Sequence, residues 1–364
     1  MFTSFFLLSL FTAGVLAGSL CPPRESIYPC SCSNIQLGKK NYMTSVYCHH
    51  VHSSDSLAAI FPSLRAIKID VLHLYDSFWE AHKIEKAGED KRVLPTDWLT
   101  LLKVTEIDIV DTTLSQCFAC QSKLVCRNTM TQKFSITNSS SHDKICTLCD
   151  SGKNNKYSWT SCMSRLKHFH FSHGKLSSIN FDLFPYEMKE LTILNLTHNE
   201  IVTVDAKAIK NLPRLKTLDL SHNLIQYLHN MFIIEMTNLE YLDVSWNNIQ
   251  TLGNKFFSKL PNLVTFNLAY NTIQQLDESE WEGVPIKSLK NIDLTDNQLH
   301  CDCSIQWINS TFPVHTMLLG RCSTPEEYEN SLLRKASRML NERCDGSSIG
   351  TRNRRTTTPM SKIY

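Results

Sequence analysis

The sequence has no excess of charge of either sign. Its 364 residues carry 37 Lys and Arg against 35 Asp and Glu, which gives a formal net charge of +2 at pH 7. A protein that binds nucleic acid through its overall charge needs a basic excess or a basic face, so this balance argues against a nucleic-acid partner. Hydrophobic residues make up 42% of the chain, which excludes both a disordered protein and one that crosses a membrane several times.

The sequence also lacks the short motifs that carry chemistry. It contains no G-x-S-x-G nucleophile motif, phosphate-binding loop, H-E-x-x-H zinc motif or dinucleotide fingerprint. Its histidines and aspartates do not stand at recognised catalytic spacings. We therefore expect no enzymatic activity, no cofactor and no metal site.

Long hydrophobic runs are missing beyond the first residues. Residues 1–19 are typical of a signal peptide, and their apolar core from Phe5 to Val15 is shorter than the about 20 residues needed to cross a bilayer. Residues 346–364 are polar and lack the hydrophobic tail of a lipid anchor, so we expect a disordered basic tail there. These features predict a secreted, extracellular protein without a transmembrane segment.

Cysteine, by contrast, is plentiful, and the fourteen cysteines fall into three even groups. In an oxidising compartment such groups form disulfides more often than zinc sites. The middle group contains two C-x-x-C pairs that also resemble the halves of a zinc ribbon, although the spacing between them is long for one. The groups are Cys21, Cys30, Cys32 and Cys48, then Cys117, Cys120, Cys126, Cys146, Cys149 and Cys162, then Cys301, Cys303, Cys322 and Cys344.

A repeat of the form L-x-x-L-x-L-x-x-N-x-L dominates the second half of the chain. Its asparagines stand at positions 199, 223, 247, 271 and 297, at spacings of 24, 24, 24 and 26. Weaker copies begin at Leu166, Val104 and Leu64, with Gly174, Thr112 and Leu72 in the asparagine position. Each unit predicts a short strand whose apolar side chains point into a core that only stacked neighbours can close.

These motifs resemble those of extracellular leucine-rich-repeat proteins. The resemblance implies an α/β fold, a leucine-rich-repeat solenoid or horseshoe with a parallel concave sheet, an irregular or short-helical convex side, and disulfide caps. It also implies the pairs Cys21–Cys32 and Cys30–Cys48 in the first cap, and Cys301–Cys322 and Cys303–Cys344 in the last. Cys-Pro-Pro at 21–23 and Leu94-Pro-Thr-Asp-Trp98 further resemble secreted arthropod leucine-rich-repeat proteins named for similarity to the non-catalytic subunit of luciferin 2-monooxygenase.

The expected domain organisation follows from these groups. An N-terminal cap covers residues 20–56, about eight repeats cover 57–300, and a C-terminal cap covers 301–345. The irregular spacing of the upstream units predicts a cysteine-rich insertion at 115–163, which departs from the arthropod pattern.

The polar positions of the repeats supply the candidate contacts. Column by column, Tyr241, Trp246 and Tyr270 form an aromatic patch beside Asp219 and Asp243 on the concave face, and exposed aromatics flanked by polar groups are common interface anchors. A second group suits either a metal or a pH sensor, although histidine is also an ordinary filler of these positions. It consists of His168, His170, His173, His198 and His222.

Three N-glycosylation sequons begin at Asn138, Asn195 and Asn309. A glycan on Asn195 would project from the concave face between the two groups and would push a partner toward the C-terminal side.

We therefore expect a recognition module that binds an extracellular protein or glycan through its concave face, in adhesion, signalling or innate defence. One alternative is a non-catalytic subunit or inhibitor of an exported enzyme. Another is a hydrolase that uses the histidine-rich face.

Overall fold

A computed structural model describes residues 21–38, 41–78, 94, 98–114, 130–139, 163–180, 183–184, 186–228 and 235–350. The expected signal peptide, the six middle cysteines and residues 351–364 lie outside the described residues. Within the described part of the chain, no helix combines the length and the hydrophobicity needed to span a membrane.

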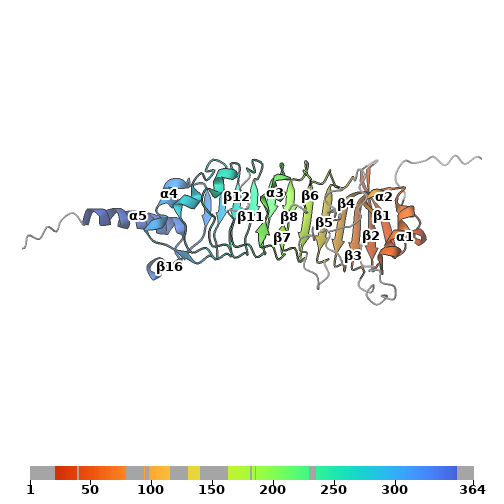
Figure 1. The fold of residues 1–364 in the computed structure, drawn as a ribbon, viewed down its shortest axis with the longest axis horizontal. Coiled ribbons are helices and arrows are strands. Elements are labelled where there is room, and N and C mark those ends of the chain that lie inside the picture. The colour runs from red at the N-terminus through yellow and green to blue at the C-terminus, as the bar shows by residue number, and fades with distance from the viewer. Residues whose placement is uncertain are drawn as a thin grey trace, which may run out of the picture.

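One sheet of 12 strands runs the length of the molecule, and its strands lie side by side in nearly sequential order (Figure 1). The first two strands form an antiparallel hairpin and every later neighbour is parallel. In order, the strands are β1 (Cys30–Gly38), β2 (Asn41–His49), β3 (Lys68–Tyr75), β4 (Lys103–Val110), β5 (Lys133–Thr137), β6 (His168–Ser172), β8 (Ile193–Asn195), β10 (Thr217–Asp219), β11 (Tyr241–Asp243), β12 (Thr265–Asn267), β13 (Asn291–Asp293) and β15 (Met317–Leu319).

Shorter elements close the remaining sides of the coils. Two further pairs of parallel strands are β7 (Ser178–Ile179) with β9 (Thr203–Val204), and β14 (Leu299–His300) with β16 (Cys322–Thr324). The helices are α1 (Ser54–Leu64), α2 (Trp98–Leu101), α3 (Ala206–Lys210), α4 (Trp307–Thr311) and α5 (Leu333–Gly350). The 3-10 turns are η1 (Arg24–Ser26), η4 (Phe256–Lys259), η5 (Glu278–Trp281), η6 (Cys303–Ile305) and η7 (Glu326–Tyr328).

The repeat asparagines lie inside the solenoid and join successive coils. The Asn247 amide nitrogen donates to the carbonyls of Leu220, Val244 and Ser245 at 3.0–3.1 Å, and its oxygen accepts from the Ile225 backbone nitrogen at 2.9 Å. Asn223, Asn271 and Asn297 repeat this pattern. Buried backbone groups at each turn therefore find partners without water.

The predicted insertion at 115–163 needs a correction, because residues inside it form β5. This strand pairs with β4 on one side and β6 on the other, and Phe134 and Ile136 are completely buried. The first apolar position of this coil is occupied by Thr131, whose hydroxyl donates to the Val104 carbonyl at 3.1 Å. A search for leucine-like residues misses the coil for that reason, and 130–139 belong to the solenoid.

The register of the first repeat also differs from the prediction. Ile69, rather than Leu64, pairs with Val104, and Leu72 pairs with Ile107 as a core residue. Leu64 instead ends α1, which buries Leu57, Ile60, Phe61 and Leu64 on one face. A run of apolar residues that passes from a helix into a strand fits both the helical and the strand spacing. The spacing alone therefore placed the start of the first repeat at the wrong residue.

Both ends of the core are closed by capping segments with disulfides. The structure contains Cys21–Cys32 and Cys30–Cys48 at the first end, and Cys301–Cys322 and Cys303–Cys344 at the last. These are the pairings that the family resemblance implies.

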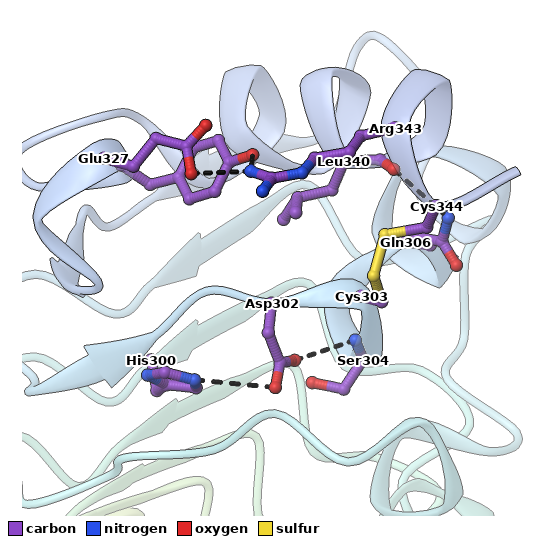
Figure 2. Close-up of a disulfide and its surroundings, with 10 residues drawn as sticks. His300, Asp302, Cys303, Ser304, Gln306, Glu327, Leu340, Arg343 and Cys344 are labelled. Carbon is purple, nitrogen blue, oxygen red and sulfur yellow. Dashed lines mark hydrogen bonds and ion pairs between the residues drawn. A yellow bond between two sulfur atoms is a disulfide. The ribbon is translucent and has the colours of Figure 1, made fainter. Parts of the chain in front are cut away.

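The last cap is tied together around Cys303–Cys344 (Figure 2). Asp302 begins η6 by accepting from the Ser304 backbone nitrogen at 2.8 Å, and Arg343 on α5 contacts Glu327 at 2.6 Å. α5 buries Leu333, Ala336 and Leu340 and continues to Gly350. Residues 346–350, expected in the tail, are therefore helical, because extending an existing helix costs far less than starting one.

Candidate binding surface

The sheet has one face against the core and one face directed away from it, which we call the open face. Two columns of side chains cover the open face because alternate residues of a strand point the same way. The column through Asp219 and Asp243 contains Tyr47, His73, Asp108, Ser135, His170, Asn195, Asp219, Asp243, Asn267, Asp293 and Leu319. Asp108, Asp219, Asp243 and Asp293 make this column acidic, and it contains no Lys or Arg.

A stack of five rings lies where the strands of five successive coils end. We call it the ring ladder, and it consists of His173, His198, His222, Trp246 and Tyr270. Neighbouring ring centroids are 4.3, 4.0, 5.1 and 4.0 Å apart, and the planes are within 14° of parallel. The ladder joins part of the predicted histidine group to part of the predicted aromatic patch.

The backbone conformation at the strand ends determines where the rings of the ladder lie. Each of its residues has a φ between 52° and 56°, in the left-handed region. Lateral hydrogen bonds then fix each turn to the next coil: the Trp246 nitrogen donates to Ala269 O at 2.9 Å and the Tyr270 nitrogen to Thr295 O at 2.8 Å. The identical turn at each coil places the rings at the spacing of neighbouring parallel strands, about 4.8 Å.

Trp246 and Tyr270 form the aromatic end of the ladder and are exposed, as are His173 and His198, whereas His222 is half-buried. The side chains of Trp246 and Tyr270 remain 48% and 41% accessible. Trp246 is stacked between His222 and Tyr270, so ring edges form most of the surface that Trp246 presents. Trp246 and Tyr270 are close together, as the sequence predicts for a patch.

The other three predicted contact residues are occupied within the fold. Asp243 is 8% exposed, and its carboxylate accepts from Tyr241, Ser245 and Asn267. Asp219 accepts from the Ser221 backbone and from the Asn195 amide. Burial raises the pKa of Asp219 and, with the Asp243 charge, that of Tyr241. Asp219 and Asp243 thus hold neighbouring strands together, and Tyr241 donates to Asp243 of its own strand.

The predicted histidines divide into two environments. His168 is exposed at the start of β6, whereas His170 is half-buried with its Nε2 2.8 Å from the Ser172 hydroxyl. Burial lowers the pKa of His170, and burial together with the charges of His222 and His173 lowers that of His198. Among the described residues, no three His, Cys, Asp or Glu side chains are grouped as metal ligands.

The sequon asparagines differ in accessibility. Asn138 is exposed at a left-handed turn and donates to Asp111 Oδ1 at 2.7 Å. Asn195 is half-buried, and its amide nitrogen donates to Asp219 at 3.1 Å. Asn309 packs against α5, where its amide nitrogen donates to the Ser337 hydroxyl at 2.9 Å. Glycosylation at all three remains a prediction.

A second group of rings at the N-terminal end of the open face escaped the sequence analysis. It consists of Tyr47 and His49 on β2, His73 and Tyr75 on β3, and Asp108 on β4, and we call it the Tyr47 cluster. Tyr47 lies in the cap, which has no repeat register, so its pairing with His73 was not visible in the sequence. The alternation of polar and apolar residues from Lys68 to Tyr75 was the available signal.

Comparison with known proteins agrees with the observed sheet. The family model described as leucine rich repeat matches residues 189–249 and 237–299. A chain of the crystal structure of the TLR13–ssRNA13 complex is 21% identical with a TM-score of 0.51, and the match covers 75% of this chain and 34% of that one. The present chain thus spans about a third of the length of that protein. The chain therefore folds as an α/β leucine-rich-repeat solenoid with disulfide caps.

Two other comparisons concern a second solved structure and the curated proteins. A chain of the octameric complex of Latrophilin 3, Unc5D and FLRT2 is 14% identical with a TM-score of 0.41, and the match covers 73% of this chain and 88% of that chain. No curated protein matches the sequence.

Proposed function

We propose that the protein is an extracellular recognition module that binds a partner protein through the Trp246 and Tyr270 end of the ring ladder and the adjoining open face. The observation that carries this proposal is the pair Trp246 and Tyr270, two large rings held rigidly by stacking yet 48% and 41% exposed. Large, pre-ordered aromatic side chains contribute the most binding energy at protein interfaces because they lose little conformational entropy.

A protein fits this surface better than a glycan does. A sugar ring packs on a free aromatic face, whereas the faces of Trp246 are covered by His222 and Tyr270. Exposed ring edges beside half-buried hydrogen-bonding groups suit the mixed apolar and polar surface of a protein.

An extracellular setting is supported by the four disulfides of the two caps, because such bonds persist in oxidising compartments. The expected signal peptide also supports an extracellular setting. The proposed role is binding without covalent chemistry, since Asp219 and Asp243 beside the ladder are engaged in hydrogen bonds between strands.

The test is a double variant, Trp246→Ala with Tyr270→Ala. We expect it to be exported and folded normally but to bind the partner at least roughly tenfold more weakly, as loss of interface anchors does. The partner is first identified by proximity labelling with the exported wild-type protein, and dissociation constants are then measured by surface plasmon resonance.

Tyr186→Ala is the matched control, because Tyr186 is 58% exposed but lies outside the ladder. It should bind like the wild type. Equal affinity of the double variant and the control would refute the ladder as the contact surface. Loss of binding after glycosidase treatment of the partner would show that the surface recognises a glycan and not a protein. A complex of fixed stoichiometry with an exported enzyme would favour the subunit or inhibitor alternative.

A further inference from the structure

The Tyr47 cluster is a connected group of rings and one carboxylate on three neighbouring strands. Tyr47 stacks on His73 with centroids 4.5 Å apart and planes 7° from parallel. The Tyr75 hydroxyl lies 2.7 Å from His73 Nδ1 and 2.6 Å from Asp108 Oδ2. The ring of His49 meets Tyr75 edge to face at 5.2 Å. These contacts hold the side chains in one arrangement.

The positions of the protons follow from the hydrogen bonds. Burial and the bond to Asp108 raise the pKa of Tyr75, so its hydroxyl stays protonated and donates its one proton to the carboxylate. The Tyr75 oxygen can then only accept from His73, which places the proton of a neutral imidazole on Nδ1. When the imidazole is neutral, its Nε2 therefore has a lone pair.

The groups that remain available are therefore acceptors. Among the described residues, His73 Nε2, Asp108 Oδ1 and the Tyr47 hydroxyl have no hydrogen-bond partner. The side chains of His73 and Asp108 are 18% and 29% exposed, so both can be reached from solvent while their surroundings are partly dry. A partly buried carboxylate attracts a cation more strongly than an exposed one does.

The immediate surroundings leave the site negative. On the open face, Lys133 of the adjacent strand β5 is paired with Glu106 at 3.5 Å. Within the part of the chain that the structure describes, no Lys or Arg forms an ion pair with Asp108. On the far side of Tyr47, the paired residue of β1 is the small, exposed Ser31, and no second ring from the described residues stacks on that face.

We propose that the Tyr47 cluster binds an arginine side chain of a partner protein. A guanidinium has only donors and a planar shape, which matches two or three acceptors beside stacked rings. Its methylene stem has apolar ring surface to cover at Tyr47. The cluster lies on β2 to β4, whereas the ladder residues lie in the coils that begin with β6, so the site is independent of the ring ladder.

The probe is N-acetyl-arginine amide, and the matched neutral probe is the corresponding citrulline derivative. Titration of the folded full chain is followed through the imidazole carbon signals of His73 by NMR. We expect a saturable shift with the arginine probe and at least roughly tenfold weaker binding of the citrulline probe, because a bond to a charged group is stronger than one to a neutral group.

Two variants locate the effect. Asp108→Asn should weaken arginine binding at least roughly tenfold, and Tyr47→Leu, which leaves the hydrogen bonds among His73, Tyr75 and Asp108 intact, should weaken it less. Asp293→Asn removes another carboxylate of the same column and should change nothing. The Trp246→Ala, Tyr270→Ala variant should also bind the probe normally, so this result is separable from the test of the ladder. Equal binding of both probes, or no saturable shift, would overturn the proposal.

Discussion

Single residues at the strand ends decide what this surface presents. A left-handed backbone is tolerated best by Gly, Asn, Asp and His, and Asp76, Asp111, Asn138 and His173 follow that preference. Trp246 and Tyr270 adopt the same conformation against it. The stacking between them and the lateral hydrogen bonds of the turn offset this conformational cost, and two large rings are kept at the surface.

Acid should weaken the fold through two of the histidines. The pKa values of His170 and His198 lie below the ordinary value of 6.5 in the folded protein, so the unfolded chain binds more protons between the lowered values and 6.5. The free energy of unfolding therefore falls as the pH drops through that window. We expect urea unfolding from pH 7 to pH 5 to show this fall, and His170→Asn with His198→Asn to make it shallower.

His315→Asn removes an exposed imidazole and is the control for that pair of substitutions. A double variant whose pH dependence equals that of the wild type would show that these two side chains do not carry the effect.

At the scale of elements, β5 shows how a coil is recognised by its neighbours. Phe134 stacks on Phe169 with ring centroids 5.8 Å apart and also approaches Trp98 at 6.5 Å. Its backbone pairs with strands on both sides. The strand is thus part of the continuous core, and the six middle cysteines lie before and after it in the sequence.

Truncation of Phe134 tests this placement. Phe134→Ala should lower the free energy of unfolding by about 3–5 kcal/mol, as for other buried aromatic residues, and by a similar amount to Phe169→Ala. Chemical denaturation monitored by circular dichroism measures both. Lys133→Ala removes only an exposed ion pair and should cost at most about 1 kcal/mol. If Phe134→Ala lowered the free energy of unfolding as little as Lys133→Ala does, residues 130–139 would belong to a peripheral insertion and not to the core.

At the scale of the whole molecule, the open face differs from a surface for nucleic acid. The column through Asp219 and Asp243 carries four aspartates and no Lys or Arg. In the neighbouring column of the open face, Lys133 is paired with Glu106. A phosphate backbone needs several unpaired cations along its path. The likeness to a protein crystallised with RNA concerns the fold, and the charges of the aspartate column are opposite to those that RNA requires.

The corresponding prediction is an absence of RNA binding. A fluorescent single-stranded RNA of mixed sequence should show no saturable change in anisotropy with the full chain at physiological salt. The Asp108→Asn, Asp293→Asn variant should behave in the same way, since it removes acid without adding base. Saturable binding that weakens as salt rises would contradict this prediction.

The candidate surface was only partly visible in the sequence. The repeat spacing put Trp246 next to Tyr270 and three of the histidines, His173, His198 and His222, in one column, because each residue occupies the same position in its unit. The spacing did not show that the carboxylates of Asp219 and Asp243 accept hydrogen bonds from neighbouring strands, nor that Tyr47 stacks on His73. Those contacts depend on register between coils and on the cap, where no repeat sets the register.

The sequence by itself determined the solenoid, the five strong repeats with their asparagines, and the even cysteine groups at both ends. Periodicity reports burial, and a core built from one repeated strand must repeat its apolar residues. Only the tertiary structure decided that β5 belongs to the sheet, that the strand of the first repeat, β3, starts at Lys68, and which polar groups remain unpaired on the open face. A buried threonine such as Thr131 is stable only because a carbonyl of the neighbouring coil accepts its proton, and that partner exists only once the coils have stacked.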